Sequence, residues 1–562
     1  MSSLTAERFI SKFLSAGAFF TTIFVAAWWT TEPVNAPKMV VLAILAFSCL
    51  SVMFLEISSW RKTKNSRVIL VSIFFGVWII LTSLLSSEPF AMNFYGVAGR
   101  NTGLLTYLSL TIIFIAALVI KSKVNFEAII KSFLFAGFFN IIYCLFTLFG
   151  IELLPWNNVY NTILGTFGNP NFIGAFLGMF LVAIFTKLVA NGVSLTYRLF
   201  YVVVIIITFV EILRSHAIQG LAVSAIGVGF VVWLRIHSMT KSKLVELTYL
   251  GFSASLGLLA TLGALQIGPL TQYIYKTSVS LRGQYWLAGW NMGSTHPIFG
   301  VGLDGYGSWY RRARAPQSII TPGVDTTSNA AHNIYIDIFA SGGIPLLIAY
   351  SVLTGFVIRS IVRLIRRSRD FDVTGVLLSA VWICYQAQSI ISINQIGLAV
   401  WGWIFGALII GYESSSESTL QVGKNTKIDQ QKFSKKSKNV SEPGLVMGAI
   451  AGALVGLFIA LPAFLVDVKW RSAMASGDIE VVEGAARAWP TDPVRLNEAI
   501  KIFMDNKYPD TGRQLVNLAV EKFPDGFISW YSFSQMPNLT EAEKTLILSN
   551  LRRLDPLNPK YK

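Results

Sequence analysis

Charged side chains are scarce in this sequence of 562 residues. They make up 14% of it, whereas 53% of the residues are hydrophobic and the mean hydropathy is +0.57. A soluble globular protein carries about 25% charged residues. The composition therefore excludes a large soluble enzyme and favours an all-α membrane bundle, in which apolar runs of about 20 residues cross the bilayer as helices.

Cysteine is rare as well, and no metal-binding pattern stands out. Cys49, Cys144 and Cys384 each lie inside an apolar run, so we expect neither a disulfide framework nor a cysteine metal site. No P-loop, sugar-nucleotide or zinc motif is convincing, and we expect neither a metal nor a cofactor. The first apolar run lacks the cleavage site of a signal peptide, so we expect it to remain as a helix.

The net charge of +16 fits either a nucleic-acid partner or the Lys and Arg excess on the cytoplasmic side of a membrane protein. Residues 467–562 carry 13 basic and 13 acidic side chains, so the whole excess lies in the apolar part. Basic clusters follow every even-numbered apolar run, such as the arginines from Arg359 to Arg369. We therefore expect a multi-pass protein of the cytoplasmic (inner) membrane, with its N-terminus in the cytoplasm and no nucleic-acid partner.

The apolar runs predict about thirteen membrane spans, within a range of twelve to fourteen. The seventh run is short, and the break before the eighth is compatible with a re-entrant feature. The predicted spans are 12–30, 39–57, 68–87, 104–120, 129–150, 172–190, 199–213, 219–236, 245–268, 334–358, 372–391, 396–412 and 444–466.

Polar stretches divide the chain into parts. Residues 1–412 are predicted to form the main membrane domain, with a large extracytoplasmic loop at 269–333. Loops of this length are uncommon unless they carry a function. The Ser- and Lys-rich stretch 413–443 is predicted to be a flexible cytoplasmic linker. The last span, 444–466, then places residues 467–562 outside the cytoplasm.

The tail 467–562 has helical periodicity and regularly spaced prolines. Pro490, Pro524 and Pro556 are 34 and then 32 residues apart. A tetratricopeptide repeat (TPR) is a helical hairpin of about 34 residues. We expect a small TPR-like helical domain that either binds a protein partner or packs on a neighbouring domain; an unrelated helical bundle is the alternative.

Two polar stretches outside the cytoplasm carry residues suited to chemistry. Arg282 begins an amphipathic helix that places Tyr285 at the membrane interface. His332 and Asn333 lie at the outer mouth of the tenth run. Asp337 lies about one turn deeper, where a carboxylate needs a partner and would orient the histidine. A histidine with a pKa of about 6.5 accepts a proton at neutral pH, and a guanidinium pairs with phosphate oxygens.

The order of these motifs resembles the O-antigen ligase and polymerase superfamily. The resemblance covers residues 90–412 in order and spacing. It rests on four motifs, which are Gly99-Arg100-Asn101-Thr102-Gly103-Leu104, Gly165-Thr166-Phe167-Gly168-Asn169-Pro170-Asn171, Arg282 followed by Pro297-x-x-Gly300-x-Gly302, and His332-Asn333-x-Tyr335 followed by Gly342-Gly343-Ile344-Pro345-Leu346.

The resemblance implies an enzyme that takes a glycan from a polyprenyl-pyrophosphate carrier without a metal. It implies that His332 is the general base; the alternative is that His332 only caps a helix. It also implies that Arg282 binds the pyrophosphate; the alternative is that its side chain only extends from the membrane interface into water. The family's second arginine lies in a Ser-Arg-Gly motif, where this sequence has Gln219 before the glycine. Arg214 and His216 lie near that position, and we expect all three to contact the substrate.

Further residues of these motifs are candidates for binding the substrate. Arg100 either contacts the carrier phosphate or anchors a loop. Asn169 and Asn171 either bind sugar hydroxyls or cap the sixth span. We also expect Tyr285 and Asn333 to line the site.

The hypothesis is an inverting, metal-independent transfer of a lipid-linked glycan to an acceptor hydroxyl outside the cytoplasm. The acceptor is a glycolipid as in a ligase, a glycan as in a polymerase, or a protein Ser or Thr as in an O-oligosaccharyltransferase. Two other classes stay open. A transporter or flippase of a polar lipid or solute would place charges near the bilayer midplane and show inverted repeats. A catalytically inactive scaffold would use the tail for assembly.

Overall fold

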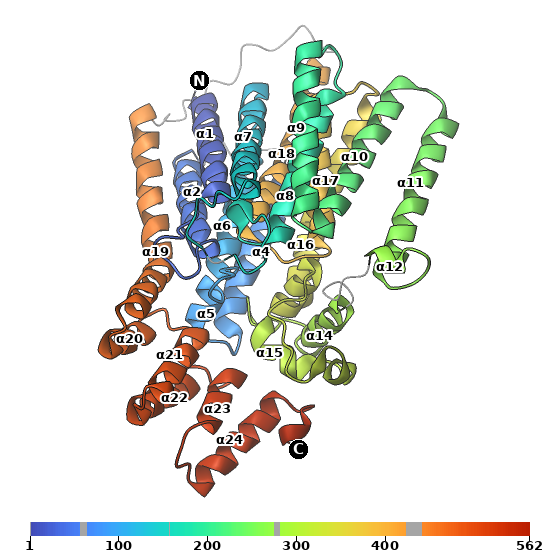
Figure 1. The fold of residues 1–562 in the computed structure, drawn as a ribbon. Helices are drawn as coiled ribbons and strands as arrows, with labels where there is room; N and C mark the ends of the chain where they lie inside the picture. The colour runs from blue at the N-terminus through green and yellow to red at the C-terminus, as the bar shows by residue number, and fades with distance from the viewer. Residues whose placement is uncertain (1, 57–64, 157, 275–280, 423–440, 562) are drawn as a thin grey trace.

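The computed structural model describes residues 2–56, 65–156, 158–274, 281–422 and 441–561. In these ranges the chain forms helices and no strand. This confirms the predicted all-α class. The long helices run side by side as a bundle, and the small helical tail lies at one end of it (Figure 1).

Each of the thirteen predicted spans corresponds to a helix. Ten of the described helices are long and apolar enough to cross a membrane, which makes this a multi-pass membrane protein. They are α2 (Asn35–Leu55), α4 (Ser66–Leu85), α7 (Lys123–Leu148), α8 (Pro170–Leu188), α9 (Leu195–Arg214), α10 (Ile218–Met239), α11 (Lys243–Ala264), α16 (Ile334–Arg367), α18 (Ile396–Val422) and α19 (Glu442–Ser476).

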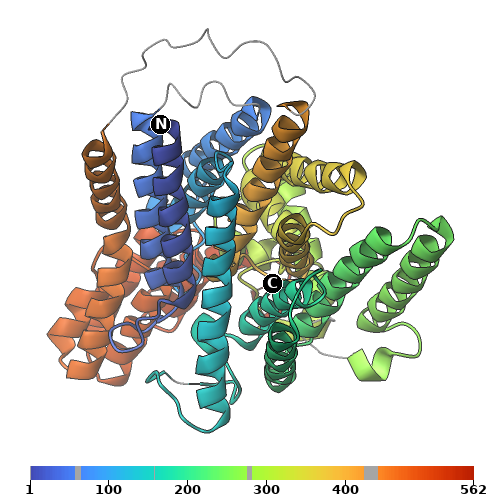
Figure 2. The ribbon, with the colours of Figure 1, turned by 90° about the horizontal axis from the view of Figure 1, so that it is seen from above.

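Three predicted spans are helices that lack the length or the apolar character of the other ten. Helix α1 (Ser2–Ile23) carries Glu7, Arg8 and Lys12, while α6 (Leu104–Ala117) and α17 (Val373–Ser389) are short. All three are packed among the longer helices in Figures 1 and 2. The total of thirteen spans therefore stays a prediction.

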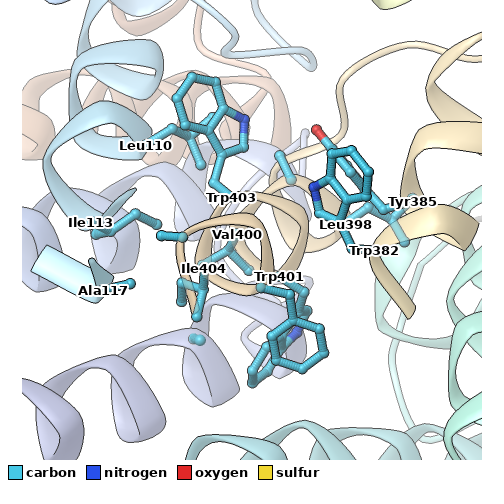
Figure 3. Packing of buried hydrophobic residues seen from close by; sticks show 14 of the residues in the cluster. Leu110, Ile113, Ala117, Trp382, Tyr385, Leu398, Val400, Trp401, Trp403 and Ile404 are labelled. Carbon is cyan, nitrogen blue, oxygen red and sulfur yellow. The ribbon is translucent and has the colours of Figure 1, made fainter. Parts of the chain in front are cut away.

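Helix α18 is the centre of the bundle. Within its span Ile396–Ser415, 94% of the most apolar 18-residue stretch is buried inside the protein. The Trp401 ring lies 5.1 Å from the Phe133 ring, and its indole N–H donates to Thr22 Oγ1 at 2.7 Å. Figure 3 shows Trp401, Trp403 and Ile404 of this helix packed beside Leu110 and Ile113 of α6 and Trp382 of α17. Apolar side chains all around α18 explain this position, because such a helix is stable only where its whole surface is covered.

The predicted linker is partly helical. Helix α18 continues past residue 412 to Val422, which differs from the flexible stretch expected from 413 onward. The Glu413 carbonyl accepts a hydrogen bond from Arg367 Nη1 at 2.8 Å, and its carboxylate pairs with the same guanidinium. This pairing with the end of α16 keeps the chain helical beyond the apolar run. Residues 423–440 lie outside the described residues.

The tail is a separate small helical unit with its own apolar core. Helix α19 continues to Ser476, so the first part of the predicted tail extends the last span. The helices α21 (Pro493–Asp505) and α22 (Pro509–Lys522) form one pair, and α23 (Phe527–Ser534) and α24 (Glu541–Leu554) form the next. Helical structure is confirmed, whereas the TPR-like family of the tail stays a prediction. The short α20 covers Ile479–Ala486.

The short helices of the loops gather at the tail-bearing end of the bundle, opposite the N-terminus (Figure 1). The long loop and the tail therefore share one end, as the alternation of the spans predicts. These helices are α5 (Phe90–Tyr95), α12 (Thr271–Ile274), α14 (Arg282–Thr295) and α15 (Tyr306–Ala313). Three further short helices are η1 (Gly165–Phe167), η2 (Ile319–Gly323) and η3 (Pro559–Tyr561).

Candidate active site

Two glycines bring the helix of Arg282 against the helix that follows His332. A Cβ at Gly289 would lie 2.6 Å from Ile336 Cγ2, and one at Gly293 would lie 2.6 Å from the Phe339 ring. These distances are too short for any larger residue. Gly289 and Gly293 therefore allow α14 to pack closely on the first turns of α16. This packing brings the motif of Arg282 and the motif of His332 together.

His332 lies in a tight turn directly before α16. Its φ is +55°, in the left-handed region. The side-chain Oδ1 of Asn333 accepts from the backbone N–H groups of Tyr335 at 3.0 Å and Ile336 at 3.2 Å. Asn333 therefore caps α16, and its contact with substrate stays a prediction.

Asp337 holds the same turn from one helical turn further on. Its Oδ1 accepts a hydrogen bond from the Ala331 backbone N–H at 2.7 Å. We had expected the carboxylate to orient the imidazole. In the structure it binds the backbone just before His332, and so positions the histidine through the turn.

The His332 side chain is partly buried beside aromatic and cationic groups. The Tyr285 ring lies 5.7 Å from the imidazole, as expected for a residue that lines the site. Burial, followed by the charges of Arg282 and Arg100, lowers the pKa of His332 to about 4. His332 is therefore neutral at pH 7 and has a free nitrogen that can accept a proton.

Arg282 is a partly buried cation at the start of α14. Its Nε makes no hydrogen bond, and no ion pair with it is present among the described residues. Burial lowers the pKa of this guanidinium, which still stays charged at neutral pH. A half-buried cation without a carboxylate partner is a ready site for an anion.

Arg100 reaches the site from the loop before α6. One of its Nη atoms donates to the Asn329 carbonyl, and its Nε lies 3.4 Å from Asp304 Oδ1. The side chain is only 10% exposed. Arg100 therefore anchors a loop, and its charge acts on His332. Its contact with the carrier phosphate stays a prediction.

Asp304 is a site residue that the sequence reasoning missed. Its carboxylate accepts from Thr102 Oγ1 at 2.7 Å and from the backbone N–H groups of Val97 at 3.0 Å and Thr102 at 3.2 Å. It thus ties the loop that carries Arg100 to the Gly-rich turn after α14. The only hint in the sequence was an Asp between the glycines of Gly302-Leu303-Asp304-Gly305, in a loop. Its role was not predictable, because its hydrogen-bond partners lie about 200 residues away along the chain.

The remaining predicted residues form a second polar group at the starts of α8 and α10. We call this set the Gln219 group; its members are Arg214, His216, Gln219, Asn169 and Asn171. We call His332, Arg282, Arg100 and Tyr285 the His332 group. The Arg214 side chain is exposed and does not contribute to the lowered pKa of His332. The Arg214 carbonyl accepts from Thr162 Oγ1 at 2.6 Å.

Gln219 itself is buried and bound inside the protein. It is 4% exposed, and its Nε2 donates to Gln388 Oε1 of α17 at 2.9 Å. His216 is exposed in a turn with a φ of +54°. Gln219 therefore links two spans, and its contact with substrate stays a prediction.

Asn169 and Asn171 lie at the start of α8. Asn169 is the N-cap, since its Oδ1 accepts from the Asn171 backbone N–H at 2.9 Å. Its Nδ2 donates to the Tyr160 hydroxyl at 3.1 Å. Of the two alternatives for Asn169, the structure confirms capping.

Residues 172–351 match a protein-family model described as O-antigen ligase. The chain contains an O-antigen ligase domain. The matched segment begins in α8 and ends in α16, so it includes Arg282 and His332. A search of the curated proteins finds no match. The domain is that of a membrane glycan transferase of the ligase or polymerase type, in agreement with the resemblance seen in the sequence.

Proposed function

We propose that this O-antigen ligase domain transfers a glycan from a polyprenyl-pyrophosphate carrier to an acceptor hydroxyl, on the side of the membrane that carries the tail. His332 is the general base, and Arg282 and Arg100 bind the pyrophosphate. One observation carries the proposal. A neutral, partly buried imidazole lies within the electrostatic reach of two guanidinium groups, and one of them has no acidic partner among the described residues.

The reaction needs a base and a stabilised leaving group. The acceptor O–H bond breaks and its proton passes to the free nitrogen of His332. The acceptor oxygen attacks the anomeric carbon while the bond from that carbon to the pyrophosphate oxygen breaks. The electron pair leaves with the pyrophosphate, whose growing negative charge the two arginines stabilise. A single displacement of this kind inverts the configuration at the sugar.

The donor also adjusts the basicity of His332. In the free protein, the positive charges of Arg282 and Arg100 contribute to the low pKa of the imidazole. A bound pyrophosphate would neutralise these charges, and the pKa of His332 would then rise toward its ordinary value. The base therefore becomes stronger once the donor is in place.

Fixed guanidinium charges take the place of a metal ion in this mechanism. Within the described residues, no three or more His, Cys, Asp and Glu side chains are grouped so that they would hold a metal. We propose that the arginines supply the positive charge that other pyrophosphate-cleaving sites take from a divalent cation.

The proposed orientation places the site outside the cytoplasm. The basic residues Arg363, Arg366 and Arg367 lie at the end of α16 that is far from His332. A concentration of arginine at one end of the spans favours that end for the cytoplasm. The opposite end, with His332 and the tail, then faces outward from the inner membrane.

The test is a transfer assay with the purified full chain, a polyprenyl-pyrophosphate-linked glycan and one acceptor class at a time. We expect the mass of one acceptor to increase by that of the glycan, with release of polyprenyl pyrophosphate. The acceptor that gains mass distinguishes ligase, polymerase and protein transferase. An intact donor with all three acceptors would contradict the proposal, and movement of the intact donor across a vesicle membrane would favour a transporter instead.

A further inference from the structure

A buried ion cluster joins the tail to the loop that supports the site. Asp555, at the end of α24, is 0% exposed. One carboxylate oxygen accepts from Arg314 Nη2 at 2.6 Å and the other from Arg311 Nη1 at 2.9 Å. Both arginines belong to α15 or directly follow it, and the Arg314 side chain is also fully buried. Both carboxylate oxygens of Asp555 therefore bind arginines of the loop.

Further contacts extend the same interface. The Arg311 guanidinium lies 4.2 Å from the centre of the Phe527 ring of α23. Arg312 Nη2 donates to the Asp525 carbonyl at 3.4 Å, and its guanidinium stacks on Trp309 at 3.7 Å. Three arginines of one short segment are thus held by tail residues. A lone surface ion pair stabilises little, whereas a buried network of this kind is costly to break.

Helix α15 in turn packs against the residues around His332. The Tyr306 hydroxyl donates to the Tyr285 carbonyl at 2.6 Å. The Tyr310 ring lies 5.9 Å from the Tyr285 ring, and the Tyr285 ring lies 5.7 Å from His332. Tyr306 and Tyr310 are both buried. A continuous series of packed groups therefore runs from the tail carboxylate to the imidazole.

We propose that Asp555 is a positioning residue for glycan transfer, so that the tail holds α15 and α14 in the geometry in which Arg282 and His332 act. This inference rests on the proposed function for its effect on rate. It goes beyond the two roles expected for the tail, partner binding and packing on a neighbouring domain, because here the tail acts on the site of its own chain.

The physical reason lies in the two arginines. Replacing Asp555 by Asn keeps the size of the side chain but removes its charge. Arg311 and Arg314 then repel each other without a counter-ion, and burial of Arg314 becomes unfavourable. The segment loosens or moves toward water. The site loses its fixed geometry, and small displacements of reacting groups lower rates by up to about 100-fold.

The experiment compares Asp555→Asn and Arg314→Gln in the full chain with a matched control, Glu483→Gln. Glu483 pairs with Arg487 inside the tail at 2.8 Å, at a position remote in sequence from α24. Steady-state transfer gives kcat and the KM for acceptor, and hydrogen–deuterium exchange follows the amides of α14, α15 and α21.

We expect both test variants to lower kcat roughly 10- to 100-fold with little change in the acceptor KM. Exchange should become faster in α14 and α15 and stay unchanged in α21. The control should behave as the natural chain. Unchanged exchange in α14 and α15 would overturn the inference, and so would an effect confined to the acceptor KM, which would make the tail an acceptor-docking element. If the natural chain transfers no glycan, the proposed function fails, while the exchange data still test whether Asp555 holds α14 and α15 in place.

Discussion

The His332 group and the Gln219 group both have residues in the matched segment 172–351, but they differ in the charge that they bury. Gln219 is neutral and its Nε2 donates to Gln388 Oε1, while Gln219 Oε1 and Gln388 Nε2 are buried without a hydrogen bond among the described residues. Arg282 has a buried Nε without a hydrogen bond, and no carboxylate among the described residues pairs with it. Burial of a charge without a partner is far more costly than burial of a neutral amide. This difference in charge favours the His332 group as the site of an anionic ligand, whereas the hydrogen bond between Gln219 and Gln388 joins two spans.

The largest expected effect separates the arginines of the two groups. Arg282→Ala removes a cation that stabilises the leaving pyrophosphate, and we expect kcat/KM for the donor to fall roughly 10²- to 10³-fold. Arg214→Ala removes an exposed cation and should cost less than about tenfold. Steady-state transfer with purified variants measures both. Equal losses in the two variants would contradict the difference drawn between the groups.

A smaller effect is expected at Asp304, which holds the Arg100 loop. Asp304→Asn keeps the size of the side chain but removes the charge that faces Arg100 Nε at 3.4 Å. The change also weakens the hydrogen bonds that Thr102 and Val97 donate to the carboxylate. A lost charge-assisted hydrogen bond is worth about 1.5–3 kcal/mol, which corresponds to a fall in kcat/KM of roughly 10- to 100-fold. Donor binding, measured with a polyprenyl-pyrophosphate analogue, should weaken as well. Unaltered donor affinity would show that Arg100 does not contact the pyrophosphate.

The smallest effect is expected in the Gln219 group. The double variant Gln219→Leu, Gln388→Leu removes both partners of one buried hydrogen bond and leaves neither unsatisfied. Such paired replacements are nearly neutral, so kcat should change by less than about threefold. Each single variant leaves one buried amide alone and should lower the thermal midpoint of unfolding more than the double variant does. A large loss of kcat in the double variant would place Gln219 in the site after all.

Much of the fold was predictable because membrane spans are local features of the sequence. Each of the thirteen apolar runs became a helix, since the bilayer length sets the run length. The continuation of α18 to Val422 was not predictable from hydropathy. It depends on the pairing of Glu413 with Arg367, which only the packing of α18 beside α16 brings together.

The site was predictable to the extent that its residues stand in ordered motifs. Arg282, Tyr285 and His332 were predicted and do gather in the structure. Asn333 was assigned to substrate, but a short polar side chain before a helix serves equally well as a cap, and the sequence does not separate the two roles. Asp304 and Asp555 were missed because their partners are distant along the chain.

The most direct test of the central claim is the pH dependence of single-turnover transfer from a saturating, pre-bound donor in the natural chain and in His332→Ala. His332 must be neutral to accept the acceptor proton, so the rate should fall as the pH drops through its pKa. That pKa is about 4 in the free protein and should lie higher in the donor complex, where the pyrophosphate offsets the arginine charges. We predict that His332→Ala binds the donor normally, transfers roughly 10²- to 10⁴-fold more slowly and loses this acid limb. An equal rate and an unchanged pH profile in the two proteins would contradict the account.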